Sequence, residues 1–321
     1  MSTSALLILN RSSGTGHAAE LADQLAKALE SGYGSSLEVR SVVVDDHPEA
    51  RSEAARHALA GSRPSLVVAA GGGGTLRAAV EGVLEAFPVT PPGPDVLRLA
   101  ALRMGSGNVV ARSLGIPRNA LAAARQVGEG LARDLTKPCA VLRCTHGLPG
   151  GGTAVRHAVT MCGLGQWGLV PGDIARWRQR HARGRKRAAS LVGLERVNGL
   201  EYVIFGAARM LAGTVSRSRC AMVEMDGERQ IRLLAAIALT QPLPPLPDPG
   251  VALGDEAIGL TVVPRLGRPF KRRLEARDSF ALRLLDRDSV EFFLDEDPEE
   301  ATGWLRLDLA GVLAFVPGRA A

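Results

Sequence analysis

The chain has 321 residues, of which 46% are hydrophobic and 22% are charged, a composition that indicates a soluble globular protein with room for two domains. Its net charge of +6 favours an anionic partner: nucleic acid, an anionic membrane surface or a phosphate-bearing substrate. No run of about 18 apolar residues occurs, which excludes a membrane-spanning helix, and the start lacks the basic region of a signal peptide. We therefore expect a cytoplasmic protein.

In the first part of the chain, segments typical of strands and of helices alternate. Leu21, Leu25 and Leu29 recur at every fourth position, which predicts a helix with one buried face. Strands are predicted at 5–10, 36–45, 66–70 and 96–103, and further helices at 48–60, from 76 onwards, and at 117–131 with Pro117 at the helix start. Such alternation indicates a parallel sheet with right-handed crossovers and helices on both faces.

Three glycine-rich turns follow three of the predicted strands. The turn 71–75, Gly-Gly-Gly-Gly-Thr, leads from a strand into a helix. Glycines allow backbone N–H groups to approach a phosphate without an intervening Cβ, and the helix adds the positive end of its dipole. The turns 10–16 and 103–108 also follow strands, at the carboxyl ends where open α/β sheets bind ligands. Alone, the turn 10–16 is not a Walker A loop and is also typical of an ordinary Asn/Ser turn.

After about residue 135 the pattern changes to short strand-like runs separated by turns. One helical region, about residues 171–213, interrupts them. This pattern predicts a mainly antiparallel β-sandwich or barrel as a second domain. The predicted runs are 138–145, 156–165, 218–227, 230–240, 257–264, 272–278, 289–297 and 311–317.

The cysteines and histidines do not indicate a metal site. Cys139 and Cys144 have no second close pair to complete a zinc tetrad, and we expect the four cysteines to be reduced and mostly buried. The six histidines are scattered, and we expect His17 and His57 at exposed helical positions. The sequence names no metal ligand and leaves the oligomeric state open.

The three glycine turns, in this order and at these intervals, resemble the catalytic-domain family of diacylglycerol kinases. That family includes sphingosine kinases and bacterial lipid kinases and is more distantly similar to NAD kinases. Residues 198–213 and 289–318 are also similar to family segments, so the resemblance spans nearly the whole chain. The matching turn positions are Asn10, Ser13, Gly14 and Gly16; Gly71, Gly72, Gly74 and Thr75; and Gly105, Gly107, Asn108, Ala111, Arg112, Leu114, Gly115, Ile116 and Pro117.

The resemblance implies a lipid kinase that uses ATP and Mg²⁺ to phosphorylate a lipid hydroxyl, of a diacylglycerol-like or sphingoid acceptor. It implies a nucleotide-binding α/β domain at 1–135, to which a strand at 305–317 returns, and a β-rich lipid-substrate domain at 136–304. Asp295 and Asp297 are the implied catalytic carboxylates. The implied nucleotide-binding residues are Asn10, Ser13, Gly14, Gly16, Gly71, Gly72, Gly73, Gly74, Thr75, Arg77, Gly105, Ser106, Gly107 and Asn108.

The departures from the family pattern concern its carboxylates. Gly73 and Val109 stand where the family has aspartates, and Glu296 stands where it has the glycine of D-G-E. One acid–base group contributes roughly 10²–10⁴-fold in rate, so an alternative is a degenerate member that binds nucleotide or lipid without phosphoryl transfer. Only Asp255 is retained of a second acidic motif that could hold a structural Mg²⁺.

Two other acidic positions have alternative interpretations. The letters Asp-Gly-Glu recur at 226–228, where they are more typical of a hairpin turn. Asp45, at the end of the second predicted strand, could serve a dinucleotide-dependent oxidoreductase, but the first glycine turn is incomplete for that role.

The run Arg176–Arg187 contains seven basic residues and no acidic one. It is suited to peripheral contact with anionic lipid at the inner face of a membrane, at about 1 kcal/mol per charge. The alternative is a solvated, partly disordered helix. Nucleic acid is not an expected partner, because aromatic residues for base stacking are nearly absent.

Overall fold

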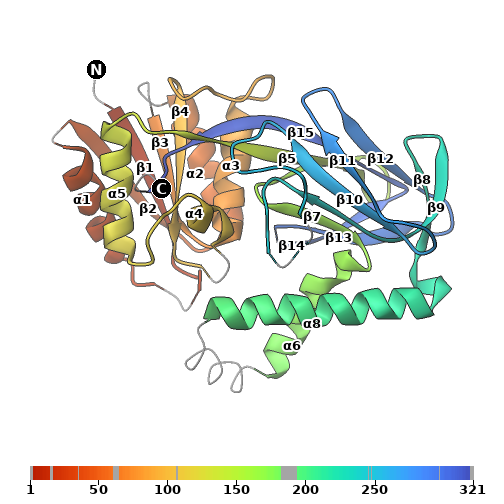
Figure 1. Cartoon of the computed structure of the whole chain (residues 1–321). Helices are drawn as coiled ribbons and strands as arrows, with labels where there is room; N and C mark the ends of the chain where they lie inside the picture. The colour runs from red at the N-terminus through yellow and green to blue at the C-terminus, as the bar shows by residue number, and fades with distance from the viewer. Residues whose placement is uncertain are drawn as a thin grey trace. The chain divides into compact units, whose positions relative to one another are not determined.

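A computed structural model describes residues 3–14, 17–34, 36–60, 65–105, 108–181, 194–244, 246, 248–295 and 297–318, with the side chains of 194–199 left out (Figure 1). The chain falls into two compact units. Unit 1 consists of Met1–Ala140 and Gly311–Ala321, and unit 2 consists of Val141–Ala310. Each unit buries its own set of hydrophobic side chains.

Unit 1 is built on a parallel sheet of β1 (Thr3–Asn10), β2 (Leu37–Val44), β3 (Ser65–Gly71) and β4 (Leu97–Arg103). Their order is β2-β1-β3-β4. All residues of β3 and nearly all of β1 are buried, as expected for strands covered on both faces. The last strand, β15 (Trp304–Phe315), reaches this sheet at its end, where Phe315 pairs in parallel with Leu99.

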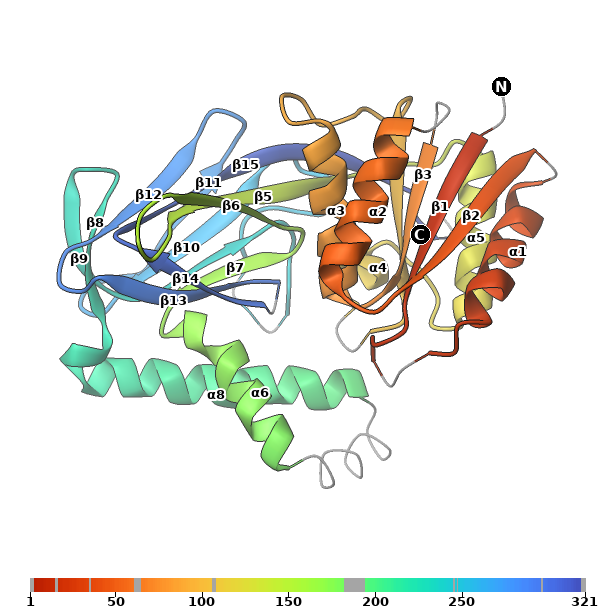
Figure 2. The same cartoon turned by 180° about the vertical axis from the view of Figure 1, so that it is seen from behind.

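Two pairs of helices cover the opposite faces of this sheet (Figures 1 and 2). One pair is α1 (Leu21–Tyr33) with α5 (Ala120–Ala132), and the other is α2 (His47–Ala60) with α3 (Gly73–Ala86). The buried residues of α1 are Ala22, Leu25, Ala26 and Leu29, whose spacing forms one apolar face. A short helix, α4 (Val109–Ser113), follows β4. The predicted parallel sheet with helices on both faces is confirmed.

The start of α5 differs from the prediction. The helix begins at Ala120, three residues after Pro117. Asn119 is the N-cap, and its side chain accepts a hydrogen bond of 2.9 Å from the backbone N–H of Ala122. An asparagine side chain satisfies a free N–H of the first turn, which proline at that place would not do.

The expectation of exposed helical histidines is wrong for both residues named. His17 lies before α1 and is half-buried, with Nε2 3.3 Å from the carbonyl oxygen of Met104. His57 lies in α2, but its side chain is buried. Burial lowers the pKa of His57, the charge of Arg40 lowers it further, and a hydrogen bond with the backbone of Leu66 acts in the opposite direction.

Unit 2 is mainly antiparallel. Its hydrogen-bonded path runs β14-β13-β7-β9-β8-β12-β15, with β10 and then β11 added at β9, and with β5 and β6 added at β15. The pairings with a described register within this unit are antiparallel. The strands are β5 (Lys137–Gly147), β6 (Thr153–Ala158), β7 (Met161–Gly165), β8 (Ala221–Met225), β9 (Arg229–Leu239), β10 (Ile258–Pro264), β11 (Phe270–Leu274), β12 (Ser279–Leu284), β13 (Ser289–Leu294) and β14 (Asp297–Thr302).

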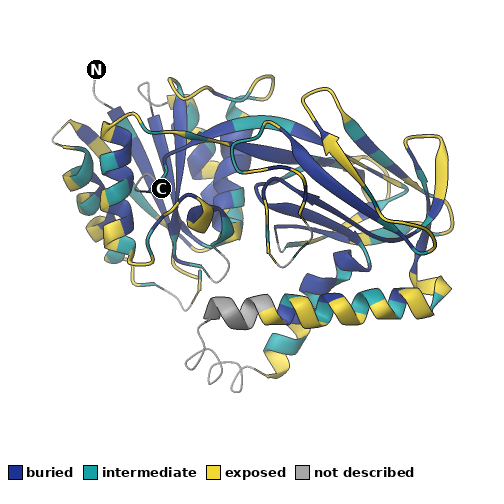
Figure 3. Ribbon diagram, in the orientation of Figure 1, coloured by how far each residue is buried: buried dark blue, intermediate teal, exposed yellow. Residues whose placement is uncertain are grey.

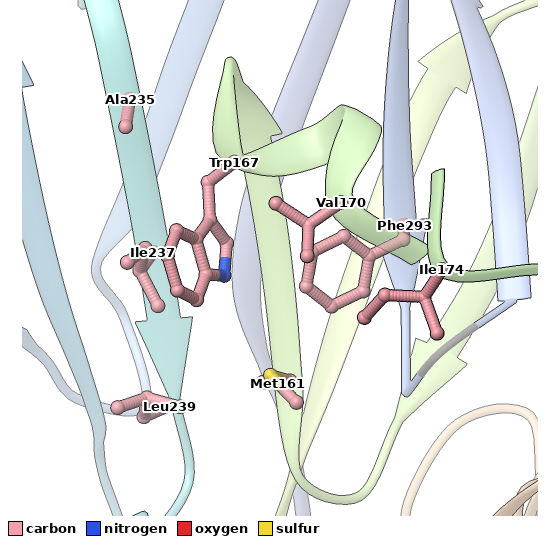
Figure 4. Close-up of a cluster of buried hydrophobic side chains, with 8 residues drawn as sticks. All are labelled: Met161, Trp167, Val170, Ile174, Ala235, Ile237, Leu239 and Phe293. Carbon is pink, nitrogen blue, oxygen red and sulfur yellow. The ribbon is translucent and has the colours of Figure 1, made fainter. Parts of the chain in front are cut away.

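In the described part of the chain, the predicted helical region of unit 2 contains the helices α6 (Val170–Arg180) and α8 (Leu194–Val215), with single turns η1 (Trp167–Leu169) and η2 (Arg217–Arg219). Residues 182–193 lie outside the described part. The helices pack on a core cluster of Met161, Trp167, Val170, Ile174, Ala235, Ile237, Leu239 and Phe293 (Figure 4). The predicted fold class, a parallel α/β domain followed by a mainly antiparallel domain with one helical region, is confirmed.

The cysteines behave as predicted, since all four are free and buried. No described helix is long and apolar enough to cross a membrane. Within the described residues, no group of three or more His, Cys, Asp or Glu side chains is arranged to hold a metal ion.

Candidate functional site

The three glycine turns lie together at one edge of the unit 1 sheet. They follow β1, β3 and β4, which are hydrogen-bonded neighbours and run parallel. Their carboxyl ends therefore meet at the same edge, which is where ligands bind in open α/β sheets. Gly16, Ser106 and Gly107 lie outside the described residues, so the site below is built from the others.

Buried side-chain hydrogen bonds join the first turn to the second. Asn10 Nδ2 donates to Thr75 Oγ1 at 3.1 Å, and these residues are only 1% and 0% exposed. Ser13 Oγ lies 3.3 Å from Thr75 Oγ1 and accepts a hydrogen bond from the Gly72 N–H at 3.2 Å. Asn10 Oδ1 accepts from the backbone N–H and the hydroxyl of Ser12 at 3.0 and 2.7 Å. Asn10 and Thr75 thus face each other, and their role is to hold the turns together.

The third turn is held by its own asparagine. Asn108 Oδ1 accepts the Gly105 N–H at 3.1 Å, and Asn108 Nδ2 donates to the Gly105 carbonyl. Asn108 is the N-cap of α4 with a φ of 53°, a left-handed conformation that asparagine tolerates better than most residues. Gly14 has a φ of 64°, and a Cβ there would lie 2.6 Å from the Met104 carbonyl oxygen. The first and third turns are therefore also in close contact.

The four consecutive glycines are not equivalent. A Cβ at Gly71 would collide with the Thr75 side chain, and a Cβ at Gly74 would collide with His47, both closer than 3.0 Å. A Cβ at Gly72 would meet only Gly105 Cα, at 3.6 Å. A Cβ at Gly73, the position of the missing aspartate, would meet nothing within 4 Å. Neighbouring side chains thus pack closely against Gly71 and Gly74, whereas Gly73 has room for a Cβ.

The start of α3 is suited to bind an anion. No side chain caps the helix at Gly72, and its first turn contains no acidic residue. The first N–H groups of a helix have no acceptor within the helix, and the helix dipole makes this end positive. Arg77, in the same part of α3, adds a positive charge. This combination fits a phosphate group.

Two residues that follow strands of the unit 1 sheet were missed by the sequence analysis. His47, the first residue of α2, packs against Gly74, and it follows β2 just as the glycine turns follow their strands. The rule that ligands bind at the carboxyl ends of strands would have drawn attention to it. Arg11 forms a two-pronged ion pair with Asp45, one bond measuring 2.8 Å, and this contact raises the pKa of the Arg11 guanidinium. Asp45 is thus held by a protein cation, which does not favour its use as a ribose ligand.

Asp295, one of the two carboxylates expected to be catalytic, lies in unit 2 and holds the backbone of a neighbouring turn. Its carboxylate accepts N–H groups from Val159 at 2.6 Å, Thr160 at 2.8 Å and Met161 at 2.9 Å. It is 7% exposed and has a φ of 53°. Asp297, at the start of β14, is half-buried, and Glu296 lies outside the described residues.

The other acidic positions of unit 2 have structural partners. Asp226 and Gly227 have φ values of 51° and 76° in the turn between β8 and β9, which confirms the predicted hairpin. Asp255 pairs with Arg273 at 3.0 Å. Its pKa is lowered by the backbone N–H of Ala252 and by the Arg273 side chain.

Residues 4–137 match the sequence model of the diacylglycerol kinase catalytic domain, a range that contains all three glycine turns. This segment is similar to the diacylglycerol kinase catalytic-domain family. The family resemblance predicted from the glycine turns is therefore confirmed. Among curated protein sequences, the chain has no significant match.

Solved structures extend the similarity in fold beyond that segment. A diacylglycerol kinase from Bacillus anthracis str. Sterne is 15% identical, with a TM-score of 0.59 over 98% of this chain and 97% of that one. Two candidate diacylglycerol kinases from the same strain have TM-scores of 0.62 and 0.61 at 15% and 18% identity. The first covers 98% of this chain and 97% of its own, and the second covers 99% of each. The whole chain thus has the fold of these proteins.

Proposed function

We propose that the protein is an ATP-dependent lipid kinase that transfers the γ-phosphate to a lipid hydroxyl of a diacylglycerol-like or sphingoid acceptor. The observation that carries this proposal is the edge of unit 1 where three hydrogen-bonded turns surround the uncapped start of α3. Its match to the diacylglycerol kinase catalytic domain supports the assignment of the phosphate to a nucleotide.

In the proposed reaction the lipid oxygen forms a bond to the γ-phosphorus, the bond from that phosphorus to the β–γ bridging oxygen breaks, and ADP leaves. The hydroxyl proton passes to a carboxylate. Catalysis of this kind consists largely of positioning and charge neutralisation. The backbone of Gly14, Gly71–Thr75 and Gly105 would hold the phosphates, with Arg77 adding charge. Asn10, Ser13 and Asn108 would act mainly by holding the turns.

The two acidic residues of unit 2 receive different roles in the proposal. The carboxylate of Asp295 already accepts three backbone N–H groups, so we assign it to positioning the 159–161 turn and the adjacent Asp297. Asp297 is the candidate for orienting or deprotonating the lipid hydroxyl. An Asp297→Asn enzyme that retains full turnover would contradict this assignment.

The described residues fit a triphosphate better than they fit a metal held by the protein. The start of α3 offers N–H groups and no carboxylate, because position 73 is glycine. Mg²⁺ often keeps several waters and binds chiefly through the phosphates of its substrate. We therefore propose that ATP is used with Mg²⁺, and that the metal depends on the nucleotide for its ligands.

A second candidate function is binding without phosphoryl transfer. Gly73 and Val109 favour it, since each replaces a family aspartate next to the proposed phosphate position. The protein would then bind nucleotide or lipid without transferring a phosphate group.

The proposed location is the cytoplasm, with peripheral contact to the inner face of an anionic membrane through Arg176–Arg187. Residues 182–187 of this run lie outside the described part, so the contact is argued from Arg176, Arg178 and Arg180 alone. Arg176 and Arg180 are exposed on α6, although Arg176 also pairs with Asp173, and Arg178 is paired with Glu201. Nucleic acid is not a proposed partner.

The deciding experiment is phosphate transfer from γ-labelled ATP with Mg²⁺ to a panel of diacylglycerol, sphingosine and other lipid alcohols. Labelled product from one acceptor class would support the kinase and name its substrate. ATP binding without transfer to any acceptor would favour the second candidate.

Gly73→Asp distinguishes a weakened kinase from a binding protein. Because a Cβ at position 73 meets nothing within 4 Å, this position is the most suitable of the four glycines for a side chain, and Gly73→Ala is a matched control that adds only a methyl group. In a weakened kinase we expect Gly73→Asp to raise turnover with Mg²⁺ about 10²-fold or more, and Gly73→Ala to leave it unchanged. Without Mg²⁺, the carboxylate should weaken ATP binding by charge repulsion.

A further inference from the structure

The long helix α8 has an apolar face that the core of unit 2 does not use. The large hydrophobic residues exposed on this face are Leu200 at 60%, Val203 at 43%, Ile204 at 55%, Leu211 at 67% and Val215 at 76%. Their spacing of three to four residues, with a gap filled by exposed Ala207 and Ala208, places them in one stripe along the helix. Figure 3 shows exposed segments recurring along α8.

The opposite face of α8 already supplies the contact with the core. Tyr202, Phe205 and Met210 pack against the cluster around Trp167, and Gly206 lies directly against the Trp167 ring. The helix is therefore apolar on two sides, whereas a surface helix normally presents a polar side to water. Single exposed apolar residues are common, but a continuous stripe of this kind marks an interaction surface.

The carboxylates of α8 and α6, on Glu201 and Asp173, are largely buried in ion pairs between the two helices. Between residues 200 and 215 the only charged residues are Glu201 and Arg209. Glu201, 5% exposed, pairs with Arg178 at 2.7 Å, and Arg209 pairs with Asp173 at 2.7 Å. These ion pairs fasten α6 to α8 and leave the stripe free of charge.

Both ends of the stripe carry exposed arginines. Beyond its carboxyl end, Arg217 and Arg219 of η2 are exposed and form no ion pair with a described residue. On α6, Arg180 is likewise exposed without an ion pair to the described part of the chain. The Arg176 side chain is 60% exposed but is paired with Asp173 at 2.5 Å, so its charge is partly neutralised. An apolar stripe flanked by arginines matches the cross-section of a membrane surface, where acyl chains lie beneath anionic headgroups.

We propose that α8 docks the protein on an anionic lipid bilayer, with the stripe inserted at the level of the upper acyl chains and the flanking arginines at the headgroups. The stripe is about 22 Å long at 1.5 Å per residue, which suits a helix lying in the plane of the interface. The flanking positive charge favours an anionic bilayer over a second copy of this chain, because two such surfaces would bring arginines together. The biological purpose of this docking surface, access to a lipid substrate, rests on the proposed lipid kinase function.

The test is binding of the full chain, without nucleotide, to vesicles of phosphatidylcholine alone or mixed equally with phosphatidylglycerol. We expect the mixed vesicles to bind it more tightly. Leu211→Glu should weaken this binding about tenfold or more, whereas Leu59→Glu, at a 71% exposed leucine of α2, should not. The pair Arg217→Gln and Arg219→Gln should reduce the preference for the anionic vesicles, because two of the flanking positive charges are lost while Arg180 remains.

Sedimentation of the same proteins tests the competing occupant. A wild-type dimer that Leu211→Glu converts to a monomer, with no vesicle binding by either, would overturn the proposal in favour of a second copy. Equal vesicle binding by Leu211→Glu and the wild type would also overturn it. Vesicle binding is measured without nucleotide and therefore does not depend on catalysis. A protein that binds vesicles but transfers no phosphate in the separate assay with γ-labelled ATP would contradict the proposed function and leave the docking surface established.

Discussion

The turn 71–75 of unit 1 and the turn 159–161 of unit 2 hold irregular backbone in place by opposite means. In unit 1 the glycines lack a Cβ, so that neighbouring turns can approach closely, as Gly105 approaches the backbone of Gly72. In unit 2 a single buried carboxylate, Asp295, accepts three consecutive N–H groups. Both solutions produce a defined turn at the end of a strand.

The difference lies in which N–H groups are left for a ligand. At 159–161 the three donors are already bound by the protein, so this turn is rigid and not suited to bind an anion. At the start of α3 no acidic residue of the first turn accepts the N–H groups, and the positive end of the helix is not neutralised. A turn held by glycine packing can serve as a binding site, whereas a turn held by a carboxylate serves as a support.

The largest expected effect is that of Asp295→Asn, which removes part of the carboxylate that holds the turn 159–161. One oxygen becomes an NH₂ group facing backbone donors, which leaves buried N–H groups unsatisfied. We expect the free energy of unfolding of unit 2 to fall by about 2–4 kcal/mol, measured by urea denaturation. Asp248→Asn is the matched control, because that exposed residue accepts one N–H, from Gly250 at 2.9 Å. Equal losses in the two variants would show that Asp295 is not a buried support.

Gly105→Ala tests the unit 1 turn and should have a smaller effect on stability. Its methyl group would meet the Gly72 backbone closer than 3.0 Å, so two turns must separate. We expect a loss of about 1–3 kcal/mol, together with weaker ATP binding in calorimetry. Gly73→Ala is the control, since its methyl group meets nothing. A Gly105→Ala protein with wild-type stability and affinity would contradict the close packing of the turns.

The architecture could be predicted from the sequence because it rests on local patterns. The buried strands 66–70 and 96–103 and the period of Leu21, Leu25 and Leu29 follow from hydrophobic spacing alone. The glycines after strands also predicted that the three turns follow parallel strands, as they do after β1, β3 and β4. The start of α5 was missed because proline and asparagine both signal helix starts, and the N-cap bond to Ala122 decides between them.

The partners of the site residues could not be predicted, because they depend on tertiary contacts. Asn10 and Thr75 are 65 positions apart, and nothing local shows that they bond to each other rather than to a ligand. Asp295 matched a family letter, but its acceptance of three N–H groups from 159–161 joins segments more than 130 positions apart. Likewise, the sequence shows that α8 is apolar but not that it is apolar on two faces.

The two units should also differ in their response to pH, which is the smallest of the expected effects. The folded pKa of His57 in unit 1 lies below its unfolded value of about 6.5, so its contribution to stability is present above that pH and is lost as the pH falls towards the folded pKa. Burial raises the pKa of Asp173 in unit 2, but hydrogen bonds from Arg209 and Arg176 lower it more. Its contribution is therefore lost only below about pH 4.

Hydrogen–deuterium exchange separates these two responses. Between about pH 7 and pH 5, after correction for the intrinsic exchange rate, amides of α2 should lose protection while those of α6 should not. The positive charge of Arg40, on β2, opposes protonation of the His57 imidazole, and the pairing of Arg40 with Glu53 weakens this effect without reversing it. His57→Gln cannot titrate and should abolish the loss in α2. If the His57→Gln variant loses protection as the wild type does, another group must gain the proton, and the pH response of unit 1 does not arise from His57.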